Sequence, residues 1–273
     1  PRFHIDLNRF QQELKFSKQM MIQGVLRWIR NHLDKAALGS NVPGSSLGQY
    51  DMASRVGALP FTLIVAPISQ VSYSVMSTSA RSGESIKDLY ILSLRRLLLV
   101  VFPLIVVMAM NTEGLILLLL GEKWLESQSI LLLIIYTGFF AALVGLNNEV
   151  FKALGKPKIM TKFLVWRGIF TVPAFLGASQ FGIFAVAVAR LFLAALFSPI
   201  NAYLASKLLN IRLREFLRYI LLQPILFATI VAIVNMLIAS LFKSIIITLL
   251  ISTISGLLIV LLAFWFLDRN IFT

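Results

Sequence analysis

One apolar segment decides the fold: LYILSLRRLLLVVFPLIVVMAMN, residues 89–111. It has about the 20 mostly apolar residues that an α-helix needs to cross the hydrocarbon core of a bilayer. Similar stretches lie on both sides of it along the chain. The sequence therefore predicts an all-α, polytopic membrane protein with eight transmembrane helices, near residues 14–37, 47–78, 89–111, 125–154, 158–178, 182–206, 216–240 and 244–267. Gly114–Gly121 is too short to span and is expected at the membrane interface.

The composition agrees with a membrane protein. Hydrophobic residues make up 58% of the chain and charged residues 14%, against about 45–50% and about 25% in soluble domains. The net charge is +13, but the basic residues fall between apolar segments, so we expect no nucleic-acid partner. The chain has no cysteine, which excludes disulfides and thiolate chemistry. Because it begins at Pro1, without an initiator Met or a signal peptide, we expect it to be a fragment.

Basic residues alternate between the two ends of the predicted helices. One set of connections holds Arg2, Arg9, Lys15, Lys18, Arg81, Lys87, Arg95, Arg96, Lys152, Lys156, Lys158, Lys162, Lys207, Arg212, Arg214, Arg218 and Arg269. The opposite set holds only Lys35, Lys123 and Lys243. The positive-inside rule then places both chain ends in the cytoplasm. The expected divisions are a cytoplasmic arm (1–13), a six-helix lobe (14–206), a cytoplasmic loop (207–215), two peripheral helices (216–267) and a cytoplasmic tail (268–273).

The first predicted helix carries a polar stripe. Its members recur at spacings of three or four residues and so share one face: Lys15, Gln19, Gln23, Arg27, Arg30 and Asp34. At 1.5 Å per residue the stripe runs for about 28 Å, nearly the full hydrocarbon thickness. Such a face cannot contact lipid, so we expect it to line a hydrated pathway. The alternative is a helix that lies on the membrane surface.

Five arginines lie within the apolar stretches: Arg27, Arg30, Arg55, Arg167 and Arg190. Each charge at mid-membrane costs roughly 2.5 to 3.5 kcal/mol on insertion scales, so together they oppose insertion by roughly 12 to 18 kcal/mol. The same stretches contain two clear carboxylates, Asp51 and Glu149. The excess of positive charge indicates an anionic ligand.

Some of these charges have a structural alternative. Asp51 and Arg55 are four residues apart and can pair along one helix face, or Arg55 can be shared with a ligand. Glu149 can pair with Lys152 or act as a coupling carboxylate. Arg167 and Arg190 either line a cavity or bind a neighbouring carbonyl.

Sequence motifs of enzymes are absent. The chain has no HExxH, no GxSxG and no phosphate-binding glycine loop. We therefore expect no catalytic residue, no metal site and no cofactor. Without an ATP motif, any transport would be secondary.

Three segments carry a family resemblance. LGQYDMASRV (47–56) followed by Leu59-Pro60, LLLGEKW (118–124) and ALGKP (153–157) resemble recurring stretches of bacterial polysaccharide flippases. Arg30-Asn31 with Asp34 resembles an RNxD element of their seventh helix, spaced one residue wider. These proteins belong to the multidrug/oligosaccharidyl-lipid/polysaccharide exporter superfamily, and the O-antigen and colanic-acid branch is the closest likeness.

The resemblance implies a 14-helix exporter fold, of which this chain is helices seven to fourteen: the second six-helix lobe and two peripheral helices. It implies a secondary transporter in the bacterial inner membrane that moves an undecaprenyl-pyrophosphate-linked oligosaccharide by alternating access through a cationic cavity. Arg27, Arg30, Arg55, Arg167 and Arg190 would bind the head group, and Gln19 and Gln23 the sugar hydroxyls. Asp34, Asp51 and Glu149 would couple transport to an ion or proton.

The expected partners are the lipid-linked oligosaccharide, membrane lipid, the missing N-terminal six-helix lobe and the polysaccharide polymerase machinery. Three alternatives stay open. A multidrug or small-solute exporter of the same fold would need an anionic cavity. A membrane glycosyltransferase or polymerase would need a catalytic outer loop. The third is a membrane fragment that does not transport.

Overall fold

The computed structural model describes residues 7–242 and 244–269. Every regular element in this part of the chain is a helix. In chain order they are α1 (Leu7–Gly39), α2 (Gly44–Gly57), the π-helix η1 (Phe61–Val65), α3 (Ala66–Arg81), α4 (Lys87–Met110), α5 (Thr112–Leu119), the 3₁₀-helix η2 (Glu122–Ser127), α6 (Gln128–Leu143), α7 (Asn147–Ala153), α8 (Pro157–Ser179), α9 (Ile183–Leu208), α10 (Leu213–Glu215), the π-helix η3 (Phe216–Leu221), α11 (Leu222–Leu241) and α12 (Ile245–Arg269).

Seven stretches of the described chain are long and apolar enough to cross a membrane: Gly44–Arg81, Lys87–Met110, Glu122–Ala153, Pro157–Ser179, Ile183–Leu208, Leu213–Leu241 and Ile245–Trp265. They correspond to the last seven predicted spans. Helix α1 has 33 residues and is long enough to cross, but its polar stripe keeps it outside this set. The all-α membrane fold is confirmed, whereas the crossing of α1 stays a prediction. Helix α1 begins at Leu7 rather than at residue 14.

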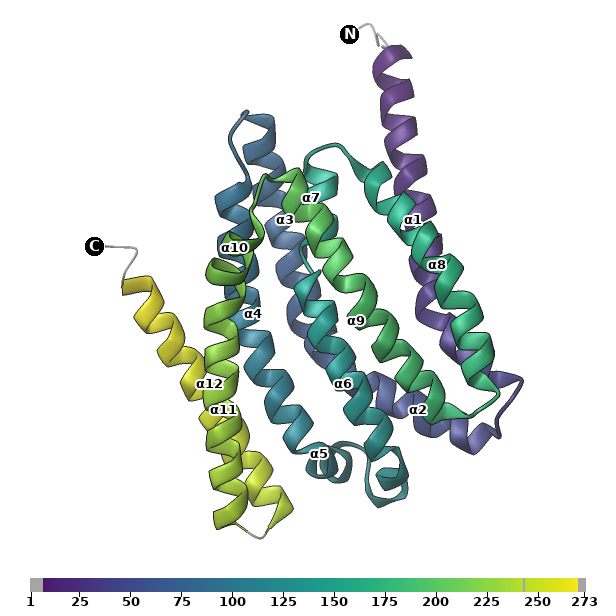
Figure 1. The fold of residues 1–273 in the computed structure, drawn as a ribbon, viewed down its shortest axis with the longest axis vertical. Helices are drawn as coiled ribbons and strands as arrows, with labels where there is room; N and C mark the ends of the chain where they lie inside the picture. Colours follow the sequence, from purple (N-terminus) through teal and green to yellow (C-terminus); the bar gives the residue numbers. More distant parts are fainter. Residues whose placement is uncertain (1–6, 243, 270–273) are drawn as a thin grey trace, which may run out of the picture.

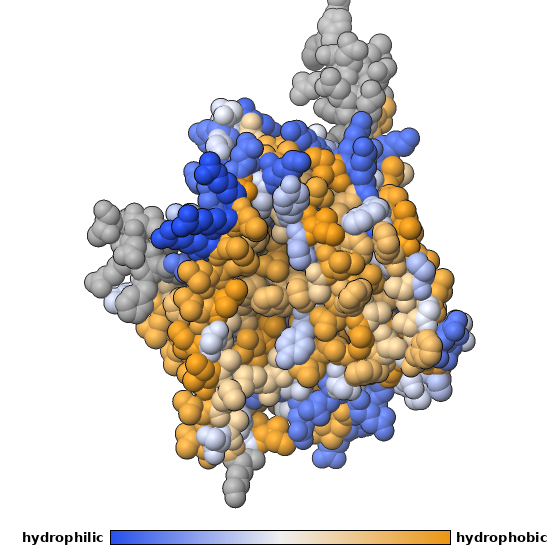
Figure 2. Space-filling model, in the orientation of Figure 1, coloured by the Kyte–Doolittle hydropathy of each residue, from blue (hydrophilic) through white to orange (hydrophobic). Residues whose placement is uncertain are grey.

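The helices run up and down between two ends of the molecule (Figure 1). The α3–α4, α7–α8 and α9–α10 connections lie at one end, and the α8–α9 connection and α5 lie at the other. An apolar belt separates two ends that carry the hydrophilic side chains (Figure 2). This is the alternation that the basic residues predict. Which end faces the cytoplasm stays a prediction. The short helix α5 lies at an end of the bundle, as expected for an interfacial segment.

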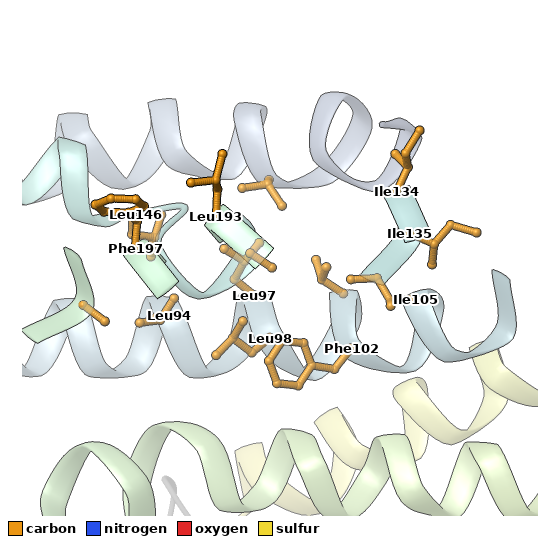
Figure 3. Packing of buried hydrophobic residues seen from close by; sticks show 14 of the residues in the cluster. Leu94, Leu97, Leu98, Phe102, Ile105, Ile134, Ile135, Leu146, Leu193 and Phe197 are labelled. Carbon is orange, nitrogen blue, oxygen red and sulfur yellow. The ribbon is translucent and has the colours of Figure 1, made fainter. Parts of the chain in front are cut away.

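Helix α4 forms the centre of the hydrophobic core. Its buried residues Leu94, Leu97, Leu98, Phe102 and Ile105 pack against side chains from α6, α9 and the α6–α7 connection (Figure 3). The rings of Phe102 and Phe139 stack with their centroids 4.1 Å apart. Most of the apolar residues in the second half of α4 are buried against protein. The membrane spans around it are thereby held in fixed positions.

Two of the spans are interrupted along their length. Pro60 lacks a backbone N–H, and the chain after it forms the short π-helix η1 before it continues as α3. Helix α6 ends at Leu143, and α7 begins only at Asn147. The Ser69 hydroxyl lies 2.6 Å from the Val65 carbonyl oxygen and 3.1 Å from that of Gly145. It therefore bonds the two irregular segments to each other.

The last two helices pack on the outside of the bundle. Helix α11 lies against α4, and α12 lies against α11, α4 and α5. The Asn111 amide donates to the Asn235 side-chain oxygen at 3.2 Å, a buried bond between α4 and α11. Gly256 of α12 lies so close to Val107 of α4 that an added Cβ would be 3.0 Å from the valine methyl. The pair is peripheral in position but firmly packed.

Candidate anion-binding site

The polar stripe of α1 faces protein. Gln23 is fully buried and Asp34 is 2% exposed, whereas Met21 is 68% and Trp28 65% exposed on the opposite face. Helices α8 and α9 and helix α2 cover the stripe side. Gln23 and Asp34 therefore contact protein, and Arg27 and Arg30 of the same stripe are half-buried.

Gln23 joins α1 to the first turn of α8. Its side-chain amide donates to the carbonyl oxygen of Pro157 at 2.8 Å and to the Thr161 hydroxyl at 3.1 Å. In this conformation Gln23 is not accessible to a ligand. A role in binding sugar hydroxyls therefore requires α1 and α8 to separate. Gln19 lies one turn earlier on the same face, and its buried side-chain oxygen has no partner among the described residues.

Asp34 is a buried carboxylate on which three helices converge. Its Oδ2 accepts from the Tyr50 hydroxyl of α2 at 2.7 Å and from Arg190 Nη1 of α9 at 2.9 Å. Its Oδ1 accepts from the backbone N–H of Lys35 at 2.9 Å. Asp34 thus neutralises Arg190 and fixes α1, α2 and α9 to one another.

A second ionic group lies next to the first. Asp51 of α2 accepts from the Lys35 ammonium at Oδ1 and from Arg55 Nε at Oδ2, the latter at 2.8 Å. The Asp51–Arg55 pair predicted from their spacing of four is confirmed. The Arg55 side chain stays 70% exposed, so most of its donors are accessible to another anion.

Three arginines have no carboxylate. No ion pair in the described part of the chain includes Arg27, Arg30 or Arg167. Arg30 lies close enough to Arg27, Arg167 and Arg190 for their charges to repel one another. Arg30 donates to the Asn31 side-chain oxygen at 3.1 and 3.3 Å, an uncharged acceptor. Arg30 thus lies near three other guanidinium groups, and among the described residues only one of the four, that of Arg190, pairs with a carboxylate.

Arg167 is held by aromatic rings rather than by an acid. Its guanidinium lies over the Phe197 ring, 5.7 Å from the centroid, and its buried Nε has no hydrogen-bond partner. Trp166 and Phe170 pack edge-on or tilted against the same ring. An unpartnered donor in a low-dielectric position is costly.

Glu149 lies apart from this group. It pairs with Lys152 at 2.9 Å in α7, at the opposite end of the bundle from α2. The alternative in which it serves as an ion-pair partner is therefore present in the structure. Its role in coupling stays a proposal.

Sequence reasoning missed two groups of residues. The first is Tyr50. It belongs to the quoted segment 47–56, yet its hydrogen bond to Asp34 depends on how α1 packs against α2. The second group is a buried chain in which Tyr90 donates to Asn147, and Asn147 donates to Asn201, each at 2.8 Å. The pair of asparagines at 147 and 148, inside an apolar span, was the signal that could have found it.

Comparisons with known proteins bear on the fold. Residues 1–129 match a family model described as "Polysaccharide biosynthesis protein". Teichuronic acid biosynthesis protein TuaB of Bacillus subtilis (strain 168) is 22% identical over 156 residues, which cover 57% of this chain and 32% of that protein. The solved structure of lipid II flippase MurJ in an inward closed conformation superimposes with a TM-score of 0.74 at 17% identity, over 100% of this chain and 57% of that one.

This chain has the fold of a lipid flippase. The resemblance to the polysaccharide exporters is confirmed, and with it a multi-pass membrane protein. The solved structure that it resembles is that of a flippase, and the likeness is one of fold. The chain spans about a third of the length of the curated relative and just over half of the solved flippase, so it corresponds to part of each.

Proposed function

We propose that this chain is the second lobe and the peripheral helix pair of a secondary transporter in the bacterial inner membrane. The transporter moves an undecaprenyl-pyrophosphate-linked oligosaccharide by alternating access through a cationic cavity. Its partners are the lipid-linked oligosaccharide, membrane lipid, a first six-helix lobe and the polysaccharide polymerase machinery. The observation that carries the proposal is the proximity of Arg30 to three other arginines of α1, α8 and α9, of which only Arg190 pairs with a carboxylate, Asp34, among the described residues.

The chemistry of this group suits a pyrophosphate diester. A guanidinium is always charged and presents paired N–H donors that match two phosphate oxygens. Arg27, Arg30 and Arg167 have no carboxylate to lose and are the first contacts for the head group. A multidrug exporter of the same fold would need a negative site for its cations, and the charge of this site has the opposite sign.

The paired arginines have a different role in the proposal. Arg190 binds the buried carboxylate of Asp34, so it becomes fully available to the ligand only when that carboxylate is protonated or displaced. Arg55 binds Asp51 through Nε alone, and its other donors stay accessible. Protonation of Asp34 would free Arg190 for the pyrophosphate, and release of the ligand would return it. Asp34, Asp51 and, more distantly, Glu149 are for this reason the candidates for coupling. Gln19 and Gln23 would bind sugar hydroxyls once α1 separates from α8.

The test is export of polysaccharide to the cell surface. Arg27→Ala and Arg30→Ala should each abolish surface polysaccharide and leave the amount of protein in the membrane near normal, because neither side chain holds a carboxylate. Arg→Lys at either position should restore export only in part, since an ammonium keeps the charge but loses the paired donors. Lys18→Ala is the matched control, an exposed cation on the same helix, and should export normally. Export at the normal rate by both alanine variants would refute the proposal.

A further inference from the structure

A shallow groove lies on the surface of the molecule where the chain enters α11. It has a volume of about 400 Å³ and is lined by Leu213, Arg214, Leu217, Arg218 and Leu222. All five side chains come from one continuous helix made of α10, η3 and α11. In Figure 2 a strongly hydrophilic patch over α10 borders the apolar surface of α11. The groove is therefore at the boundary between the polar end and the apolar belt.

The short π-helix η3 sets the register of the residues that line this groove. In a regular helix, residues seven or eight positions after Leu213 would share its face. The wider turn at Phe216–Leu221 shifts the register, so Ile220 is fully buried and Leu222 lines the groove instead. Beyond it, Leu226, Ile233 and Leu237 continue on the same face and are each more than half exposed. From Leu222 to Leu237 this apolar track is about 22 Å long.

The two arginines at the groove are not neutralised by protein. No ion pair in the described part of the chain includes Arg214 or Arg218. The nearest carboxylate in sequence, Glu215, is bound to Lys87 of α4 at 2.8 Å and accepts from the Arg212 backbone N–H. Arg218 lies over the Tyr219 ring, 5.8 Å from its centroid, and both side chains are exposed. Glu215 thus serves the contact with α4 and leaves the positive charge of the groove in place.

We propose that this groove binds an anionic phospholipid of the surrounding leaflet. Arg214 and Arg218 contact the phosphate, and one acyl chain lies along Leu217, Leu222 and the apolar track of α11. The charge complements a phosphodiester, and the length of the track is that of an acyl chain. A zwitterionic lipid carries its own cation beside the phosphate and would gain less from two arginines. This site is at one end of the bundle and is separate from the arginine group of α1, α8 and α9.

The test is retention of lipid by the purified protein. The protein is equilibrated in nanodiscs or mixed micelles with phosphatidylglycerol and phosphatidylcholine, and bound lipid is counted by native mass spectrometry. Arg214→Gln with Arg218→Gln should weaken retention of one phosphatidylglycerol about 25-fold, because each basic residue at an anionic leaflet contributes about fivefold. Arg214→Lys with Arg218→Lys should retain it. Lys156→Gln with Lys158→Gln, an exposed pair at the α7–α8 connection, is the matched control and should leave retention unchanged.

Two results would overturn the proposal. One is equal retention of phosphatidylglycerol by the Arg214→Gln, Arg218→Gln variant and the unsubstituted protein, with both folded by circular dichroism. The other is competition: if undecaprenyl pyrophosphate displaced the phosphatidylglycerol, the groove would belong to the transported lipid instead. Leu217→Gln tests the apolar half independently and should also lower retention, since it interrupts the path of the acyl chain.

Discussion

At the scale of single residues, Asp34 is the group on which the candidate site depends. Its side chain is 3% exposed, and it receives a hydroxyl, a backbone N–H and a guanidinium from three helices. A buried ion pair adds little net stability by itself, but the loss of one partner leaves the other charge uncompensated. Arg190 would then join Arg27, Arg30 and Arg167 as a fourth unpaired cation.

Asp34→Asn should therefore destabilise the protein strongly. Removal of one partner of a buried pair costs roughly 3 to 5 kcal/mol, so the midpoint of thermal unfolding in detergent and the amount in the membrane should both fall. Adding Arg190→Gln should restore much of the loss, because no unpaired charge is left. Asp88→Asn, at an exposed position in α4, is the control. Equal stability of Asp34→Asn and Asp88→Asn would show that the fold does not depend on the buried pair of Asp34 and Arg190.

The residue pairs differ in how far sequence could predict them. Asp51–Arg55 and Glu149–Lys152 lie within one helical turn, so their spacing alone indicated them. Asp34–Arg190 joins positions 156 residues apart, and Lys35–Asp51 joins two helices. Those pairs depend on tertiary packing, which no local pattern reports. The polar stripe of α1 was predictable for the same reason that the first pairs were, since helical periodicity determines it.

At the scale of helices, the two irregular spans pack most tightly at Gly145 and Val65. An added Cβ on Gly145, between α6 and α7, would lie 2.6 Å from Cγ1 of Val65 in η1. Val65 is buried and β-branched, so it has little freedom to move aside. The absence of a side chain at Gly145 is what allows the two breaks to pack together.

Gly145→Ala should consequently destabilise the fold by about 1 to 3 kcal/mol, the usual cost of overpacking a core. Val65→Ala in the same protein should recover part of that loss by making room for the new methyl group. Gly177→Ala in α8 has nothing within 4 Å of the added Cβ and should be neutral or slightly stabilising. Thermal unfolding midpoints of the three variants and the unsubstituted protein decide between these outcomes. If Gly145→Ala had the same midpoint of thermal unfolding as Gly177→Ala, the proposed close contact between Gly145 and Val65 would be refuted.

Helix positions were predictable to within a few residues because hydrophobic length determines them. The span predicted at 89–111 is α4 at Lys87–Met110, and that at 182–206 is α9 at Ile183–Leu208. The interruptions were not predicted in detail. Pro60 indicated a kink, but a proline alone does not specify that a π-helix follows it. The gap between α6 and α7 contains no proline at all.

At the scale of the whole molecule, the alternation of basic residues matches the alternation of the connections. Lys156 lies in the α7–α8 connection, at one end, and Glu122 follows α5 at the other (Figure 1). The structure groups these connections by end, and the positive-inside rule assigns the basic end to the cytoplasm.

Cysteine labelling tests that assignment directly, because the chain has no native cysteine. A cysteine in place of Lys156 should react with a membrane-impermeant thiol reagent only in inverted vesicles. One in place of Glu122 should react only in intact cells with a permeabilised outer membrane. Both positions are exposed, so a lack of access would reflect the side of the membrane rather than burial. The reverse pattern at both positions would invert the orientation proposed for every helix.

The central claim is that the arginine group binds the pyrophosphate of a lipid-linked saccharide, and its most direct test is a binding measurement. Purified protein is titrated with undecaprenyl pyrophosphate and, separately, with undecaprenyl monophosphate. The pyrophosphate lipid should bind more tightly, and Arg27→Ala with Arg30→Ala should weaken it roughly 10- to 100-fold, the contribution of one to two charge-assisted hydrogen bonds. The Lys18→Ala control should bind normally. Equal affinity of the folded double variant and the unsubstituted protein for undecaprenyl pyrophosphate would contradict the claim.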